Sequence, residues 1–145
     1  MVPAGVRRTR ATEIYVRKGT GAPATLIEKL GIKPGHRVLL VGPFDPDFKQ
    51  SLTRAGADVA SRKRADNDVI FLRADSDSDL GQLWTLQAHM KRDGAIWVIR
   101  PKGVKTVTEA DVLNAAKAAG LVDVKVARFS DTHTAEKLVI PVARR

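Results

Sequence analysis

A short apolar segment that ends abruptly at turn-forming residues constrains the fold more than any other feature. It reads Arg37-Val-Leu-Leu-Val-Gly42-Pro-Phe-Asp45-Pro46. Successive apolar residues bounded by a glycine and prolines are typical of a strand that is buried on both faces, as in a parallel sheet covered by helices. Ligands of such sheets bind at the loops that follow the carboxyl ends of the strands. This loop, however, contains neither the G-x-G-x-x-G pattern of dinucleotide sites nor the phosphate-binding pattern G-x-x-x-x-G-K-[ST].

Strand and helix patterns alternate along the rest of the chain. Residues 68–73 and 95–100 are further apolar strands, and a weaker strand is expected at residues 58–61. Helices are expected at residues 25–30 and 46–54, from the acidic run at residues 75–79 to about Lys91, and at residues 108–119. A turn at Asp93-Gly94 separates the third helix from its strand, and residues 121–130 and 135–142 form a closing hairpin. The order predicts an α/β fold, a three-layer Rossmann-like sandwich with a mostly parallel sheet and a C-terminal antiparallel hairpin.

Length and composition predict one domain preceded by a basic arm. The domain is expected at residues 25–145 and a flexible arm at residues 1–24. The chain has no cysteine, no apolar run that could span a membrane and no signal-peptide core, so we expect a cytoplasmic protein without disulfides. The formal net charge is +9, and the arm carries Arg7, Arg8, Arg10, Arg17 and Lys18. These five residues are candidates for nucleic-acid binding, and the alternative is a solubilising tail.

In the order of its strands and helices, the chain from about residue 35 to residue 142 resembles class I S-adenosylmethionine methyltransferases, above all their C-terminal half. Ile70-Phe-Leu and Gly94-Ala-Ile-Trp-Val-Ile-Arg-Pro-Lys resemble two central strands of that fold, and Gly120-Leu-Val-Asp-Val-Lys-Val its penultimate strand. The fold is reduced, because the span between Ser61 and Asp68 is too short for an additional helix and strand. More narrowly, residues 25–143 resemble a family of small bacterial proteins with no assigned function. The resemblance lies in Leu30-Gly-Ile-Lys-Pro-Gly-His-Arg-Val-Leu-Leu-Val-Gly42, the Trp-Val-Ile-Arg-Pro-Lys strand and Gly120-Leu-Val-Asp-Val-Lys. The resemblance implies a fold and a bacterial origin.

The methyltransferase resemblance also implies a pattern of residues for the methyl donor, and this chain departs from it. That pattern has an acidic residue in the first strand, a G-x-G turn after it and a carboxylate at the end of the second strand. Here Pro43 and Phe44 follow Gly42, and Arg62 stands near the position of the second carboxylate. Asp45 could replace that carboxylate or cap the helix that begins at Pro46. We therefore predict no cofactor, with S-adenosylmethionine as the alternative.

Charged residues follow the ends of several predicted strands and would meet at one edge of the sheet. The ligand-binding candidates are Gly42, Asp45, Arg62, Arg64, Arg73, Arg100 and Lys102. Arginine matches phosphate and carboxylate oxygens in two-point geometry, so an anionic small molecule or a nucleic acid is the expected partner. Arg100 is the strongest candidate because it lies between an apolar strand and a proline. The alternative is that these are solvated strand ends.

Patterns for catalysis and metal binding are missing from the sequence. The three histidines are far apart, and the D-x-D-x-D run at residues 75–79 lacks the rest of a calcium loop. We predict neither a catalytic residue nor a metal site, and we expect Trp84 and Trp97 to be core residues. Our first hypothesis is a noncatalytic binding or interaction module for an anionic partner. The alternative is a degenerate or atypical methyltransferase-like enzyme, and homo-oligomerisation through the hairpin edge is a third hypothesis.

Overall fold

The computed structural model describes residues 25–145. Residues 25–31 belong to one unit of the chain, and Ile32–Arg145 form a second. In the first unit, helix α1 (Leu26–Lys29) begins with a capping box, in which Thr25 and Glu28 bond each other's backbone N–H groups. The nucleic-acid candidates of the arm lie outside the described residues. Within residues 25–145, no helix has the length and apolar character needed to cross a membrane.

The second unit is built on one six-stranded sheet with the order β2-β1-β3-β4-β6-β5. The strands are β1 (Arg37–Val41), β2 (Asp58–Ala60), β3 (Asn67–Arg73), β4 (Met90–Pro101), β5 (Val122–Arg128) and β6 (His133–Val139). Strands β1 to β4 pair in parallel, whereas β6 pairs antiparallel with both β4 and β5. The predicted Rossmann-like sandwich with a C-terminal antiparallel hairpin is confirmed.

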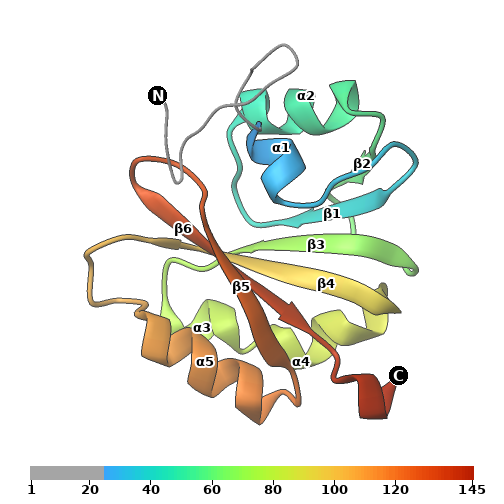
Figure 1. Ribbon diagram of the computed structural model, residues 1–145. Helices are drawn as coiled ribbons and strands as arrows, with labels where there is room; N and C mark the ends of the chain where they lie inside the picture. Colours follow the sequence, from blue (N-terminus) through green and yellow to red (C-terminus); the bar gives the residue numbers. More distant parts are fainter. Residues whose placement is uncertain (1–24) are drawn as a thin grey trace. The chain divides into compact units, whose positions relative to one another are not determined.

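Helices cover both faces of this sheet (Figure 1). Helix α2 (Pro46–Arg54) lies on one face, and α3 (Asp77–Leu80), α4 (Leu83–Leu86) and α5 (Glu109–Ala118) lie on the other. Because both faces are covered, the central strands have no polar face, and Val38, Leu39 and Leu40 are all buried. The first apolar segment was therefore correctly interpreted as a doubly buried strand.

Helix α2 has the predicted bounds, and its start explains Asp45. The Asp45 side chain accepts a hydrogen bond of 2.8 Å from the backbone N–H of Asp47, and Pro46 occupies the first helical position. Phe48 and Leu52 form the buried face of the helix. Of the two roles considered for Asp45, helix capping is the one that the structure contains.

Strand β4 does not turn at Asp93-Gly94, which corrects the sequence-based prediction. It runs through these residues, and its register against β3 shifts between the pairs Asn67–Met90 and Val69–Ala95. The extra residues of β4 form an irregularity in the sheet instead of the predicted turn between helix and strand. A Cβ atom on Gly94 would lie 2.8 Å from the backbone oxygen of Asp68, so the glycine is required by a close backbone approach.

The helix expected up to about Lys91 is also interrupted. Helix α3 ends at Leu80, α4 begins at Leu83, and a short 3-10 helix, η1 (Gln87–His89), completes the segment. Gly81 lies between α3 and α4, where its weak helix propensity permits the break. The break leaves Trp84 65% exposed, so its predicted core position is wrong, whereas Trp97 is buried as predicted.

Candidate functional site at the carboxyl edge of the sheet

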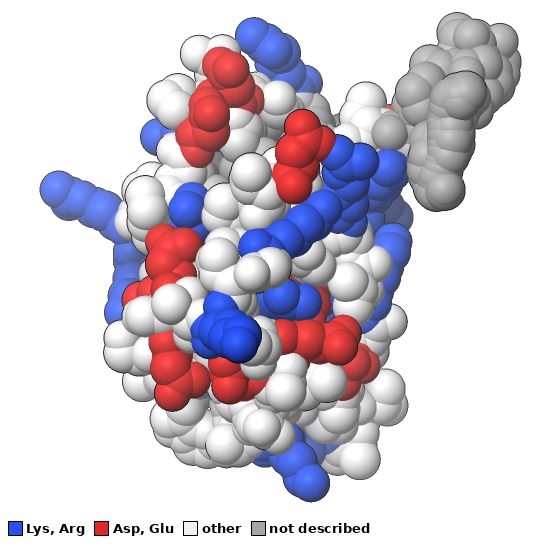
Figure 2. Space-filling view, turned by 90° about the vertical axis from the view of Figure 1, so that its left-hand side faces the viewer, with Lys and Arg blue, Asp and Glu red and all other residues white. Residues whose placement is uncertain are grey.

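Strands β1, β3 and β4 end at the same edge of the sheet, and the β5–β6 turn returns to it. His133 pairs with Pro101, and the backbone N–H of Lys102 donates to the Thr132 oxygen at 2.9 Å. Figure 2 shows this edge from outside, with Lys and Arg side chains interspersed with Asp and Glu side chains. Acidic side chains therefore accompany the predicted cations on this face of the molecule. Individual cations have to be judged by their own partners.

On the α2 side of the edge, Arg73 lies against the loop that follows β1. Gly42 has φ +97°, and a Cβ atom added to it would lie 2.9 Å from the Arg73 Cβ. The Arg73 guanidinium donates to the Pro43 oxygen at 3.3 Å and to Asp75 Oδ1 at 2.9 Å. Gly42 is thus needed for the approach of Arg73, and the Arg73 charge is paired within the chain.

The same loop contributes Phe44 to an aromatic cluster. Its ring centroid lies 5.6 Å from that of Phe48, 6.4 Å from that of Phe71 and 6.5 Å from that of Phe129. Phe48 and Phe129 are closer still, with centroids 4.9 Å apart. Edge-to-face contacts of this kind stabilise each pair beyond the burial of area. The α2 side of the edge is therefore a packed aromatic contact rather than an open loop.

His133 belongs to this side of the edge, although the sequence did not single it out. Burial lowers the pKa of His133, the nearby Arg73 charge lowers it further, and Asp75 opposes both effects. Its Nδ1 lies 2.8 Å from Thr132 Oγ1. The signal that could have found it was the predicted hairpin, because an antiparallel return from β5 brings the first residues of β6 to the ligand-binding edge of the sheet.

On the α3–α5 side of the edge, Arg100 forms an ion pair with Glu136. Arg100 lies beside Thr134 in the β4–β6 register and Val98 beside Glu136, so both charged side chains lie on the same face of the sheet as Val98. Arg100 Nε is 2.5 Å from Glu136 Oε1, and the two side chains are 14% and 1% exposed. Sequence reasoning found Arg100 but missed Glu136, whose charge within an alternating strand was the available signal.

Burial of the Glu136 carboxyl group beside Arg100 is energetically costly. Burial raises the pKa of Glu136, and the hydrogen bond and charge of Arg100 only partly offset this effect. Its Oε2 is the single buried side-chain oxygen or nitrogen without a hydrogen bond in residues 25–145. Because such an orphan is costly, a carboxyl group held in this way calls for an explanation beyond the ion pair alone.

The Arg100 guanidinium is only partly used. Its Nε makes the contact with Glu136, and neither Nη1 nor Nη2 makes a hydrogen bond to any described residue. Neither of these atoms is among the buried orphans, so both retain access to solvent. Arg100 therefore presents two donors of fixed geometry at the edge of the sheet.

The remaining candidates are dispersed. Arg64 donates to Asp58 Oδ1 at 3.1 Å and to Asn67 Oδ1 at 3.0 Å, at the amino ends of β2 and β3, so it does not meet the other candidates. Arg62 follows β2 and is exposed, as is Lys102 after β4. The carboxyl edge brings together Gly42, Asp45, Arg73, Arg100 and Lys102, with Arg62 beside them at the end of the outer strand.

The residues at this edge do not fit the methyl donor in the way that the methyltransferase pattern holds it. Strand β1 contains no acidic residue, and β2 is followed by Ser61 and Arg62 instead of a carboxylate. The place of the glycine-rich turn is filled by Pro43, Phe44 and the overlying Arg73. Within residues 25–145, no group of three or more His, Asp or Glu side chains is placed to hold a metal ion.

Solved methyltransferases share the fold of this chain. An S-adenosylmethionine-dependent methyltransferase from Aquifex aeolicus aligns with a TM-score of 0.65 and 16% identity over 79% of this chain and 88% of that protein. The ribosomal protein L11 methylase of Lactobacillus delbrueckii subsp. bulgaricus aligns with a TM-score of 0.61 and 13% identity over 79% and 74% of the two chains. The magnesium protoporphyrin IX methyltransferase of Synechocystis PCC 6803 was solved with bound S-adenosylmethionine. It aligns with a TM-score of 0.58 and 13% identity over 79% of this chain and 74% of that protein. At these identities the similarity shows the fold alone.

Sequence comparison assigns a family without assigning an activity. No curated protein matches the chain. A family described as "Protein of unknown function (DUF3052)" matches residues 27–142, which is most of the chain and agrees with the resemblance to small proteins without an assigned function. The chain is therefore a member of this family of unknown function, with a Rossmann-like, methyltransferase-like fold.

Proposed function

We propose that this protein is a noncatalytic binding module that recognises a phosphate- or carboxylate-bearing ligand through Arg100. The proposal rests on the contacts of the Arg100 guanidinium, in which one nitrogen is bonded within the chain and two remain available. Glu136 holds Nε, while Nη1 and Nη2 have no partner among the described residues. Two parallel N–H donors match two oxygens of a phosphate or carboxylate group, which is the strongest geometry for recognising such anions.

Glu136 serves in this proposal as a positioning residue. A guanidinium that is fixed before the ligand arrives loses less conformational entropy on binding than a free surface arginine. A buried carboxylate with an orphan oxygen is an expensive way to hold an arginine, and preorganisation of a binding group offsets that cost. Arg73 offers less, because Asp75 and the Pro43 oxygen engage its Nε and Nη1 and leave no free pair of Nη donors.

The shape of the site favours a small anionic group over a nucleic-acid duplex. The Arg100 side chain is only 14% exposed, so a phosphate or carboxylate has to project toward it. Nucleic-acid binding by the arm is a separate hypothesis, with a steep dependence on salt as its signature. Glu109 at the start of α5 is close enough to Glu136 to raise its pKa, so negative charge beside the site lowers the affinity that Arg100 alone would give an anion.

Titration of the full chain with inorganic pyrophosphate tests the proposal. We expect saturable binding, with Kd of about 1 mM or tighter, and a loss of roughly tenfold or more in Arg100→Met. Arg92→Met is the matched control, because Arg92 is an exposed cation at the amino end of β4 and its replacement changes the net charge equally. Equal affinity of the wild type and Arg100→Met would overturn the assignment of Arg100.

Glu136→Gln separates positioning from charge in the same titration. The glutamine keeps a hydrogen-bond acceptor while removing the carboxylate, so a purely electrostatic site would bind pyrophosphate more tightly in this variant. If Glu136 positions Arg100 through a charge-assisted hydrogen bond, the neutral amide holds Nε less firmly, and the variant binds more weakly despite its more positive local charge. Tighter binding would refute the positioning role and leave Arg100 as an unassisted cation.

A methyltransferase-like enzyme is the second candidate, and the fold shared with methyltransferases of known structure favours it. It would need a different way of holding the methyl donor, because the first loop of this chain lacks the glycine-rich turn. Calorimetric titration with S-adenosylhomocysteine distinguishes the two candidates. Micromolar binding, equivalent to about 8 kcal/mol, would support the enzyme. No heat and no thermal stabilisation by the ligand would support the noncatalytic module.

A further inference from the structure

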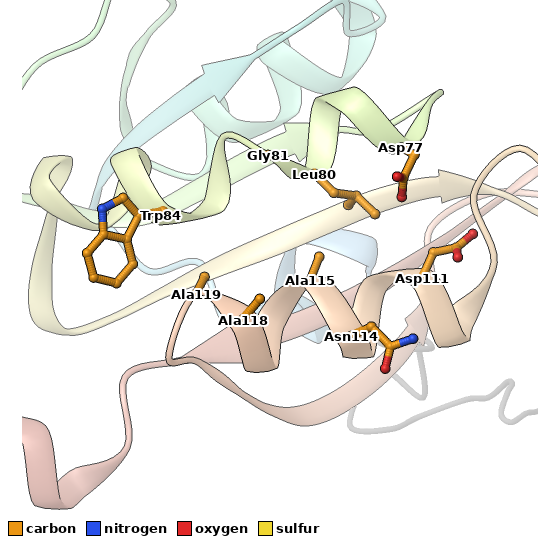
Figure 3. A pocket seen from close by; sticks show the side chains of 9 residues that line it. All are labelled: Asp77, Leu80, Gly81, Trp84, Asp111, Asn114, Ala115, Ala118 and Ala119. Carbon is orange, nitrogen blue, oxygen red and sulfur yellow. The ribbon is translucent and has the colours of Figure 1, made fainter.

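A groove between the helices of the α3–α5 face is a second candidate for molecular recognition (Figure 3). It has a volume of about 530 Å3 and runs between α3–α4 on one side and α5 on the other. The α5 side carries the small side chains of Ala115, Ala118 and Ala119, which leave room between the helices. The groove shares no lining residue with the carboxyl-edge site built around Arg100 and Glu136.

Trp84 stands at one end of this groove. Leu83 and Leu86 of the same short helix fill the inward positions with no exposure, and the indole of Trp84 is left 65% exposed. A large aromatic side chain on the surface loses the free energy that its burial would provide. Tryptophan is enriched among the residues that contribute most to the affinity of protein interfaces, where a partner restores this burial.

The opposite end of the groove is acidic. Figure 3 shows the carboxylates of Asp77 and Asp111 at the same end, away from Trp84. Asp111 Oδ2 accepts the backbone N–H of Thr108, whereas Asp77 is exposed and accepts no side-chain hydrogen bond within residues 25–145. The chain as a whole carries a net charge of +9, so this negative end is opposite in sign to the protein's average field.

We propose that the groove docks an arginine-bearing, partly apolar segment of a protein partner. The Asp77 carboxylate pairs with the arginine, and Trp84 packs on the apolar part of the segment or on the guanidinium plane. Small-molecule pockets bury most of their ligand, whereas the outer end of this groove is formed by an indole that is two-thirds exposed. A shallow groove with an aromatic residue and a charged end fits a peptide better than an enclosed ligand.

Two indole N–H signals make the test direct, because the chain has two tryptophans. The full chain, labelled with nitrogen-15, is titrated with a short blocked peptide of alternating leucine and arginine, and Trp84→Phe assigns the Trp84 signal. We expect the Trp84 signal to shift in a saturable manner while the signal of buried Trp97 stays in place. A peptide in which glutamate replaces arginine should leave both signals unchanged, since Asp77 would repel it.

Asp77→Asn and Asp93→Asn form the matched pair of variants. Asp93 is exposed and lies on β4 outside the groove, so both changes remove one surface carboxylate. We expect Asp77→Asn to weaken peptide binding at least threefold and Asp93→Asn to have no effect. Equal effects of both variants, or no shift of Trp84 up to ~10 mM peptide, would overturn the proposal. If blocked arginine bound as strongly as the peptide, the groove would recognise a small cation and not a segment of a protein, which would also overturn the proposal.

Discussion

The two sides of the carboxyl edge use arginine in opposite ways. On the α2 side, Arg73 is paired with Asp75, bonded to the Pro43 oxygen and packed on Gly42, next to a cluster of phenylalanines. On the α3–α5 side, Arg100 is held at one nitrogen by Glu136 and keeps the other two without a partner. The first arrangement completes the fold, whereas the second leaves a binding group available. The difference shows why an arginine at a strand end has to be judged by its contacts.

The largest expected effect comes from a substitution in the phenylalanine cluster on the α2 side of the edge. Phe71→Ala should lower the free energy of unfolding by about 3–5 kcal/mol, because Phe71 is fully buried and its ring contacts both Phe44 and Phe48. Urea unfolding followed by circular dichroism measures the change. If the variant does not fold, Phe71→Leu gives a smaller loss at the same site. If Phe71→Ala lowered the free energy of unfolding by less than about 1 kcal/mol, the aromatic cluster would not contribute to stability as we expect.

A smaller loss is expected at the turn that carries Arg73. Gly42→Ala should cost about 2 kcal/mol, because the positive φ of +97° disfavours a side chain and the new Cβ would lie 2.9 Å from the Arg73 Cβ. Gly35→Ala is the control, since its φ is +85° and no atom lies within 4 Å of the new Cβ. Equal losses in both variants would show that strain alone, and not the approach of Arg73, fixes Gly42.

The pH dependence of stability probes the opposite side. Because burial raises the pKa of Glu136, folding favours its protonated form. That stabilisation is complete below the ordinary pKa of 4.5 and is lost as the pH rises through the folded pKa. The glutamine of E136Q does not titrate, so the difference in stability should shift in favour of E136Q as the pH rises above about 4.5. Parallel stability curves of the two proteins would refute the raised pKa.

The smallest expected effect concerns His133, which lies with Arg73. Arg73→Met removes a positive charge that lowers the pKa of His133 and leaves the Asp75 carboxylate that raises it. The pKa of His133 should therefore rise toward its ordinary value, as followed by NMR titration of the imidazole. In the matched variant Arg92→Met, His133 should titrate as in the wild type. An unchanged pKa in Arg73→Met would separate His133 from the Arg73–Asp75 pair.

The sequence predicted most of the fold because local patterns determined it. The apolar runs identified β1, β3 and the second half of β4, and Asp45-Pro46 identified the start of α2. The path of β4 through Gly94 depends on its register against β3, which no local pattern contains. Trp84 falls on a helical apolar spacing, but the helix breaks at Gly81, so the spacing no longer determines which face is buried.

The candidate site was less predictable for the same reason. Strand ends correctly placed Arg73 and Arg100 at one edge, since this follows from parallel topology. How many nitrogens of each guanidinium have a partner depends on contacts with the loop after β1 for Arg73 and with β6 for Arg100, and these segments are far from the two arginines in the sequence. Arg64 was misplaced because the chain from β2 to β3 returns to the amino edge before Arg64 makes its contacts.

The most direct test of the account is a map of pyrophosphate-induced amide shifts in the nitrogen-15-labelled full chain. We predict that the shifts centre on Arg100 and Thr134, on the α3–α5 side of the edge, and that Arg100→Met abolishes them. The amide signals of Gly42, Arg73 and His133 should not shift, because contacts within the chain fill their side of the edge. Shifts centred on Gly42 and Arg73, and retained in Arg100→Met, would contradict the account.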